Sequence, residues 1–196
     1  MKPAVSGFVL TGGRSSRMGT AKALLPFRGG LLGAHVASVV ENACGQVTVV
    51  GDPVLYAPLQ RPAIPDLHPG IGPLGGIEAA LAASQTPWIL VAACDMPALT
   101  ADFLQDLLRE IERQPEADAI LPIPPGGPVN PLCALYHQRV LPRLREAIAS
   151  GDYKVTRALN GTQLRLIAVD SADPLRNANT PAEWQELLQT LPEWEG

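Results

Sequence analysis

Apolar residues along the chain alternate between strand-like runs and helical spacings. The runs typical of strands, each bounded by turn residues, lie at 8–10, 47–50, 88–94, 119–121, 132–136 and 164–169. Apolar residues recur at helical spacing over 32–43, 103–111, 140–148 and 184–191, the segment 77–83 is helical in propensity, and a further short helix is expected at 154–159. This alternation predicts an α/β protein, and we expect a three-layer α/β/α sandwich with a mostly parallel, Rossmann-like sheet.

Local signals support parts of this pattern. The run 88–94 is apolar without alternation, as expected for a central strand that is covered on both faces. Gly45 stands where a glycine would end a helix. Thr180 and Glu183 match a capping box with Pro181 in the first turn, so a closing helix is predicted to begin at Pro181.

Two stretches rich in glycine and proline interrupt the elements. The stretch 70–76 is expected to form a loop that leads into the helix at 77–83. The stretch 122–131 is also expected to be a loop, either a cover over a site or a plain connector.

Length and composition describe an ordinary globular protein. Its 196 residues, 46% of them hydrophobic and 17% charged, are expected to fold as a single domain over residues 1–196. No apolar run approaches the roughly 20 residues of a membrane span, and the N-terminal residues do not form a secretory signal. We therefore expect a cytoplasmic protein with no membrane partner.

Charge, cysteine and histidine content argue against further classes. The formal net charge of −4 argues against a nucleic-acid binder that relies on a general basic surface. Cys44, Cys94 and Cys133 are odd in number and widely spaced, which fits reduced, mostly buried thiols. The three histidines share no metal-binding spacing, so they are interpreted as packing or surface residues.

The candidate chemistry begins where the first strand-like run ends. That run stops at Gly12 and Gly13, and glycine lets backbone N–H groups approach an anion without a Cβ in the way. Arg14, Arg17 and Lys22 follow with two serines and no acidic residue. The spacing fits neither a Walker A loop nor a dinucleotide fingerprint. The stretch indicates a polyphosphate site, and the alternative is a solvated surface loop.

Acidic and amide side chains follow other predicted elements. Asp95 comes directly after the run 88–94, Asp66 follows a short apolar pair, and Asn177 and Asn179 precede the closing helix. Ligands of parallel sheets bind beyond the carboxyl ends of the strands, so we expect these residues to share one edge with the glycine loop. Mg²⁺ prefers carboxylate and phosphate oxygens, which makes Asp95 the predicted ligand. For Asp66 and Asn179 the alternative role is to shape turns.

Five segments, in order and over nearly the whole chain, resemble one enzyme family. They are LTGGRSSRMG at 10–19 followed by Lys22, GPLGG at 72–76, ACDMP at 93–97, PLCALY at 131–136 and NANTP at 177–181. Together they are similar to the MobA-like molybdenum cofactor guanylyltransferases. The first segment is shared by many nucleotidyltransferases, whereas the second and third favour this family.

The resemblance implies a nucleotidyltransferase-type fold and a reaction. GMP would pass from Mg-GTP to the phosphate of molybdopterin or Mo-molybdopterin, with release of pyrophosphate. Mg²⁺ is then the expected cofactor, and GTP and molybdopterin are the substrates. Transient contacts with other cofactor-biosynthesis proteins or apo-molybdoenzymes are also implied, and we expect a monomer.

By position, the resemblance also assigns roles to residues of this chain. The catalytic residues would be Lys22, Asp95 and Arg17, with Asp95 as the magnesium ligand. The nucleotide would be bound by Leu10, Thr11, Gly12, Gly13, Arg14, Lys22, Asp66 and Asp95. The acceptor would be bound by Asn177 and Asn179.

Three positions depart from the family pattern. Thr11 stands where alanine is usual, Ala21 replaces a common aspartate, and Gly51 lies where some members have an asparagine near the base. These departures leave two alternatives open. One is a cytidylyltransferase that acts on molybdopterin or on a sugar or alditol phosphate. The other is a nucleotide-binding regulatory module without turnover.

Overall fold

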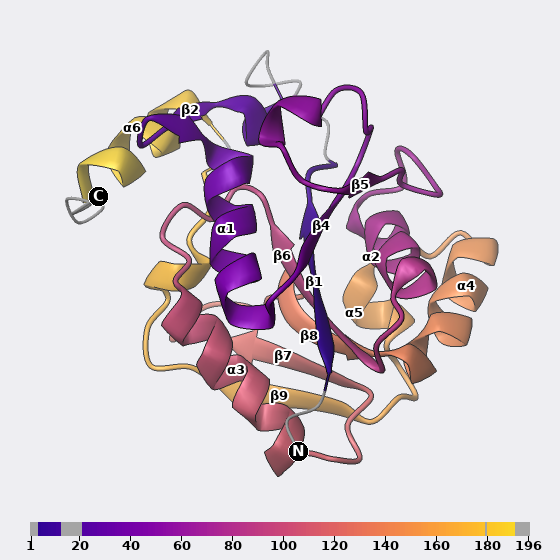
Figure 1. Cartoon of the computed structure of the whole chain (residues 1–196). Coiled ribbons are helices and arrows are strands. Elements are labelled where there is room, and N and C mark those ends of the chain that lie inside the picture. The colour runs from indigo at the N-terminus through magenta and orange to yellow at the C-terminus, as the bar shows by residue number, and fades with distance from the viewer. Residues whose placement is uncertain (1–3, 13–20, 179, 191–196) are drawn as a thin grey trace.

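The structure, a computed structural model, describes residues 4–12, 21–178 and 180–190, which form a seven-stranded sheet and a small hairpin (Figure 1). The strands of the large sheet are β1 (Val5–Leu10), β4 (Val47–Val50), β5 (Ala63–Ile64), β6 (Trp88–Ala93), β7 (Ala119–Ile123), β8 (Cys133–His137) and β9 (Leu164–Ala168). The hairpin consists of β2 (Pro26–Phe27) and β3 (Gly30–Leu31). The helices are α1 (Leu32–Cys44), α2 (Pro73–Ala83), α3 (Ala101–Arg113), α4 (Leu141–Ala149), α5 (Val155–Ala158) and α6 (Pro181–Thr190). Short 3₁₀ helices are η1 (Lys22–Leu24), η2 (Ala57–Leu59), η3 (Gln138–Val140) and η4 (Asp173–Leu175).

The sheet is mostly parallel, with the strand order β5-β4-β1-β6-β8-β7-β9. Strands β5, β4, β1 and β6 run parallel, β8 is antiparallel to both β6 and β7, and β9 is parallel to β7. The register places Leu10 of β1 beside Val50 of β4 and beside Ala93 of β6. The carboxyl ends of these three strands therefore lie level with one another.

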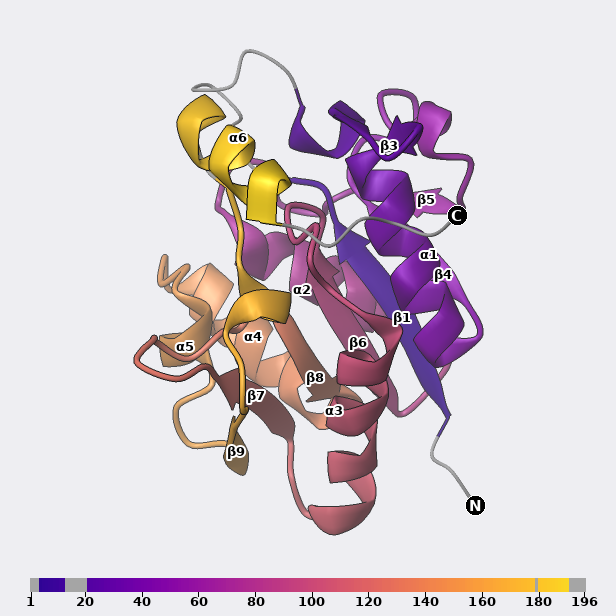
Figure 2. The same ribbon diagram turned by 90° about the vertical axis from the view of Figure 1, so that its left-hand side faces the viewer.

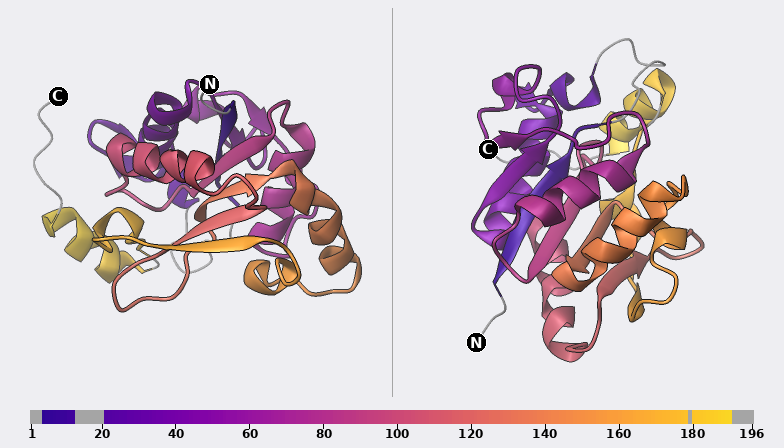
Figure 3. Two further views of the ribbon diagram at one scale, coloured as in Figure 1. Left: turned by 90° about the horizontal axis from the view of Figure 1, so that it is seen from below. Right: turned by 90° about the vertical axis from the view of Figure 1, so that its right-hand side faces the viewer.

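Helices cover both faces of the sheet. Helices α1 and α3 lie on one face, and α2, α4 and α5 lie on the other (Figures 1 and 3). Successive residues of β1 pack on opposite faces of the sheet. Val9 belongs to the apolar core under α1 and α3, whereas Phe8 and Leu10 belong to the core under α2 and α4. The predicted three-layer α/β/α sandwich is confirmed.

The closing helix packs at one end of this sandwich. Figure 2 shows α6 near the hairpin, where the rings of Trp184 and Phe27 lie with their centroids 5.9 Å apart. The helix begins as the capping box predicts, because Glu183 N donates to Thr180 Oγ1 over 3.2 Å. At the other predicted terminus, α1 ends at Gly45, whose φ of 79° is in the left-handed region.

One helix boundary differs from the sequence prediction. Helix α2 begins at Pro73, so the loop predicted over 70–76 ends at Gly72. Proline suits the first turn of a helix, because an N–H there has no partner within the helix. Gly76 lies inside the helix and packs closely on β1, since a Cβ there would lie 3.1 Å from Leu10 Cδ2, a tight contact.

The loop predicted over 122–131 is also shorter than expected, because β7 continues to Ile123. Strand β8 pairs with β7 at Ala119 and Ile120, before Pro122 is reached. The β8 ladder therefore needs no N–H from Pro122, and the proline can stay within the strand.

Three short strands were not predicted: β5 and the β2–β3 hairpin have two residues each, too few to show a period. Strand β5 is an edge strand, held by Gly51 N donating to Ile64 O over 2.9 Å.

None of the helices within the described ranges has both the length and the apolar sequence of a membrane span.

Candidate active site

The chain leaves β1, β4 and β6 at the same edge of the sheet. Two hydrogen bonds extend the ladder beyond the strand ends: Cys94 N donates to Leu10 O over 3.0 Å, and Thr11 N donates to Val50 O over 3.0 Å. Parallel sheets bind their ligands beyond this edge. Thr11 and Asp95, the residues that follow, therefore lie at the edge that the sequence predicts as the site.

Lys22 and Asp95 form an ion pair at this edge, although 73 residues separate them in the sequence. Lys22 Nζ lies 2.7 Å from Asp95 Oδ2, and the two side chains are 17% and 16% exposed. Lys22 begins η1, and Asp95 follows β6 within the turn that leads to α3. The fold thus places a cation and a carboxylate side by side, the two charges that phosphate chemistry with a metal ion needs.

The side chain of Thr11 is buried against the end of β4. Its Oγ1 donates to Val50 O over 2.8 Å, and its carbonyl oxygen accepts a hydrogen bond from the Tyr56 hydroxyl over 2.9 Å. Burial raises the pKa of Tyr56 above its usual value, which keeps this hydroxyl a donor. Sequence reasoning missed Tyr56, because a single tyrosine in a turn carries no periodic signal.

Gly51 has no room for a side chain because of these two neighbours. A Cβ at Gly51 would lie 2.6 Å from Tyr56 Cε2 and would also collide with Thr11 Oγ1. Thr11 and Gly51, two of the departures from the family pattern, are therefore parts of one packing arrangement.

Gly51→Ala is expected to lower the free energy of unfolding by about 1–3 kcal/mol, because Thr11 or Tyr56 must move to admit a methyl group. Urea denaturation measures this change. Gly30→Ala is the matched control: a Cβ there would lie 3.8 Å from Phe27 O, an ordinary contact, and stability should stay near that of the wild type. Equal stability of the Gly51→Ala protein and its control would contradict the crowding at this position.

Asp66 lies beside the glycine loop, as predicted. Its Oδ1 accepts a hydrogen bond from His68 N over 2.8 Å. Its Oδ2 lies 3.8 Å from the position that a Cβ would take at Gly12. Asp66 therefore does shape a turn, which was its alternative role. Its second carboxylate oxygen remains directed towards the first residues after β1.

The cysteines are free thiols, in agreement with the sequence prediction. Burial, followed by the charge of the neighbouring Asp95, raises the pKa of Cys94 to about 12. Burial alone raises the pKa of Cys133 to about 12. Both thiols stay protonated near neutral pH, so neither has the thiolate form that a nucleophile needs.

The remaining predicted residues are only partly described. Asn177 is exposed in the segment that leads from η4 to α6. Gly13, Arg14, Arg17 and Asn179 lie outside the described residues. The roles assigned to these five residues stay predictions.

Asp95 suits a magnesium ion that is shared with a substrate. Mg²⁺ keeps several waters and is held by one or two carboxylates together with phosphate oxygens. In the part of the chain that the structure describes, no three His, Cys, Asp or Glu side chains gather as a metal cluster. A strand-end carboxylate beside a lysine therefore fits a substrate-borne Mg²⁺ better than a closed protein cage.

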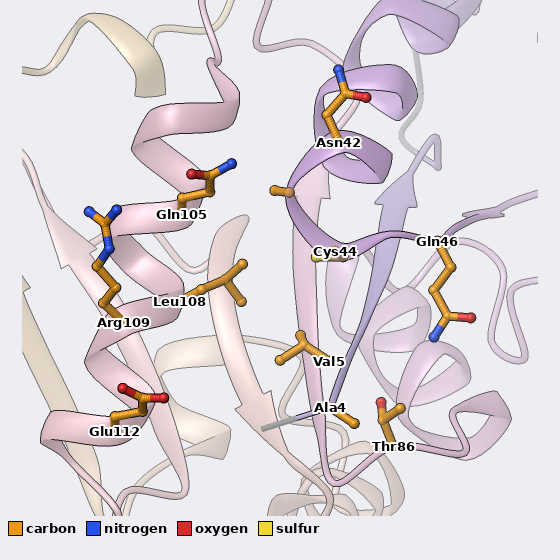
Figure 4. A pocket seen from close by; sticks show the side chains of 11 residues that line it. Ala4, Val5, Asn42, Cys44, Gln46, Thr86, Gln105, Leu108, Arg109 and Glu112 are labelled. Atoms are coloured by element: carbon orange, nitrogen blue, oxygen red, sulfur yellow. The ribbon is translucent and has the colours of Figure 1, made fainter. Parts of the chain in front are cut away.

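A cavity of about 560 Å³ lies at the opposite edge of the sheet, next to the start of β1. Figure 4 shows Leu108 of α3 pointing towards Val5, with Cys44 at the end of α1 nearby. Burial raises the pKa of Cys44 to about 12, so this thiol is also protonated near neutral pH. The cavity is separate from the Lys22–Asp95 pair and contributes no group to it.

The Lys22–Asp95 pair at the carboxyl edge of a mostly parallel sheet, at the edge where the chain leaves β1 for Gly12, fits an α/β nucleotidyltransferase. The comparison with known families agrees: the model of the MobA-like NTP transferase domain matches residues 7–166. The chain belongs to this family. The resemblance and the enzyme class predicted from the sequence are confirmed.

Individual relatives are similar over almost their whole length. The probable molybdenum cofactor guanylyltransferase of Deinococcus radiodurans is 34% identical, with 91% of each chain covered. The probable enzyme of the same name from Mycobacterium marinum is 35% identical, with 91% of this chain and 90% of the relative covered. Among solved structures, the molybdopterin-guanine dinucleotide biosynthesis protein A of Archaeoglobus fulgidus superposes with a TM-score of 0.80 at 26% identity, covering 94% of this chain and 97% of that one.

Proposed function

We propose that this protein is a molybdenum cofactor guanylyltransferase. It transfers GMP from Mg-GTP to the phosphate of molybdopterin or Mo-molybdopterin and releases pyrophosphate. The Lys22–Asp95 pair at the edge of the sheet carries the proposal, because it supplies the charges that this reaction requires next to a nucleotide-binding loop. Relatives of the same name over nine-tenths of the chain support the choice of substrates.

The reaction needs positioning and charge neutralisation more than proton transfer. An oxygen of the acceptor phosphate attacks the α-phosphorus of GTP, a new P–O bond forms, and the bond to the β-phosphate oxygen breaks. A phosphate monoester has a second pKa near 6, so the attacking oxygen is already ionised near neutral pH and requires no general base. Lys22 neutralises charge that develops on the nucleotide phosphates.

Magnesium is the proposed cofactor. Asp95 would hold the ion, which when bound would neutralise phosphate charge and align the reacting phosphorus. The chain's own contribution is to hold Asp95 at the end of β6, where Cys94 N is fixed by Leu10 O of β1.

The other assigned residues complete the proposed site. The backbone of Leu10, Thr11 and Gly12 would hold the nucleotide, and Asp66 would contact its guanosine part. Gly13, Arg14 and Arg17 would bind phosphates, and Asn177 and Asn179 would bind the acceptor. The enzyme would act as a cytoplasmic monomer, with transient contacts to the proteins that supply molybdopterin or receive the product.

Pyrophosphate release by the purified protein tests the proposal, with molybdopterin, Mg²⁺ and either GTP, CTP or ATP. Rapid release with GTP is expected, and slow release with the other two. Faster release with CTP would contradict the guanylyl assignment and would support a cytidylyltransferase. Nucleotide binding without release from any of the three would instead support a regulatory module.

A further inference from the structure

Glu78 is a buried carboxylate with a hydrogen bond from the described residues to only one of its oxygens. It lies on α2 with its side chain 3% exposed. Arg145 Nε of α4 donates to Glu78 Oε1 over 2.8 Å. The other oxygen, Oε2, is buried and has no hydrogen-bond partner among the described residues. Burying a carboxylate oxygen without a hydrogen-bond partner costs free energy, so the position of this oxygen needs an explanation.

The position of Glu78 on α2 connects it with the nucleotide site. It lies three residues after Gly75, so the two residues share a face of the helix in successive turns. Gly75 is where the Asp66 segment packs on α2: a Cβ there would lie 2.7 Å from Asp66 Oδ1 and 3.0 Å from His68 O. The segment that carries Asp66 therefore rests on one turn of α2, and Glu78 lies on the next.

His68 connects the segment to Glu78. Its backbone N–H holds Asp66 Oδ1, while its ring Nε2 lies 4.0 Å from Glu78 Oε2. This distance is too long for a hydrogen bond, and a shift of about 1 Å would form one. The segment can make such a shift, because it is exposed from Leu67 to Gly70 and ends at two glycines with φ near +90°.

We propose that Glu78 is a positioning residue for nucleotide binding. When nucleotide occupies the site beside Gly12, the His68 side chain shifts towards α2, and its ring donates from Nε2 to Glu78 Oε2. The new hydrogen bond fixes Asp66 with its Oδ2 directed at the nucleotide. Arg145 holds the opposite oxygen of Glu78 and so keeps the acceptor aimed at His68. The inference rests on the proposed nucleotide-binding role of Asp66.

A double-mutant cycle tests the coupling between the two side chains. Glu78→Gln and His68→Ala should each raise the KM and the Kd for GTP about tenfold, as expected for loss of a hydrogen bond to a charged group, with kcat within about twofold of wild type. The double variant should bind no worse than either single variant, because all three lack the same hydrogen bond. His68→Gln keeps a side-chain N–H donor and should restore much of the affinity.

A control variant and a check on folding distinguish a positioning role of Glu78 from a general loss of stability. Glu110→Gln changes another buried glutamate, which is paired with Arg113 on α3, and should leave the KM for GTP unchanged. His68 is 44% exposed, so His68→Ala should fold normally and give an interpretable KM. Additive effects in the double variant, or a wild-type KM in both single variants, would overturn the role of Glu78 while leaving the proposed enzyme intact. A wild-type protein that neither binds nor turns over any nucleotide would overturn the proposed function itself.

Discussion

Asp95→Asn is expected to reduce pyrophosphate release at least about a hundredfold at saturating GTP. Asparagine has nearly the same shape as aspartate, so β6 and its ladder to β1 should remain intact. The substitution removes the negative charge that would hold Mg²⁺ and that lies 2.7 Å from Lys22 Nζ. Turnover should therefore fall because of the chemistry and not because the protein unfolds. Steady-state pyrophosphate release, together with a nucleotide-binding measurement on the same sample, distinguishes the two causes.

Asp118→Asn is the matched control for this result. Asp118 also pairs with a cation, since Arg139 Nε lies 2.7 Å from its Oδ1, and its side chain is similarly shielded at 18% exposure. It precedes β7, away from the edge where Asp95 lies. Turnover per folded molecule should stay near that of the wild type. Full activity of the Asp95→Asn enzyme would show that turnover does not need the negative charge of Asp95.

Lys22→Met is expected to lower kcat/KM for GTP about a hundredfold or more. Methionine keeps an unbranched chain of similar length and removes the positive charge that would face the nucleotide phosphates. Both KM and kcat should change, because the phosphates carry negative charge in the bound substrate and gain more at the leaving group in the transition state. Initial rates measured over a range of GTP concentrations separate the two effects.

Two further variants support the interpretation of Lys22. Lys22→Arg keeps the charge but replaces a compact ammonium with a planar fork, so it should restore only part of the activity. Lys154→Met removes an exposed lysine at the N-cap position of α5, whose side chain makes no capping hydrogen bond, and should leave kcat/KM unchanged. Equal losses from Lys22→Met and Lys154→Met would indicate a general charge effect instead of a site.

Local chemistry made several boundaries predictable. The end of α1 depends on Gly45 adopting a left-handed backbone, and the start of α6 depends on the Thr180 side chain accepting from Glu183 N. Each signal acts over a few residues and can be read from the sequence. The start of α2 was predicted too late, because Gly75 and Gly76 look like loop residues. In the structure both glycines pack closely against residues far away in the sequence, Gly75 against Asp66 and Gly76 against Leu10.

Other features depend on tertiary packing and cannot be predicted from the pattern of hydrophobic and polar residues. Strand β8 runs antiparallel to both of its neighbours, β6 and β7, but its apolar residues read the same in either direction. Tyr56 matters because its hydroxyl reaches Thr11 O, 45 residues away. Glu78 reads as the polar position of an alanine-rich helix, and its burial becomes evident only when α4 brings Arg145 onto it. The strand-end residues Asp66 and Asp95 were predictable, since strand ends of one sheet share an edge.

The central place of β1 has a consequence for folding. β1 is synthesised first, yet it lies between β4 and β6, and β6 begins only at Trp88. One side of β1 therefore stays unpaired until the residues up to Ala93 have been made, and pairings between such distant segments fold slowly. Lys22 and Asp95 also meet only after β6 has joined β1. Affinity for nucleotide should thus arise late in refolding, and its appearance would report on the joining of β1 to β6 and not on the formation of the helices.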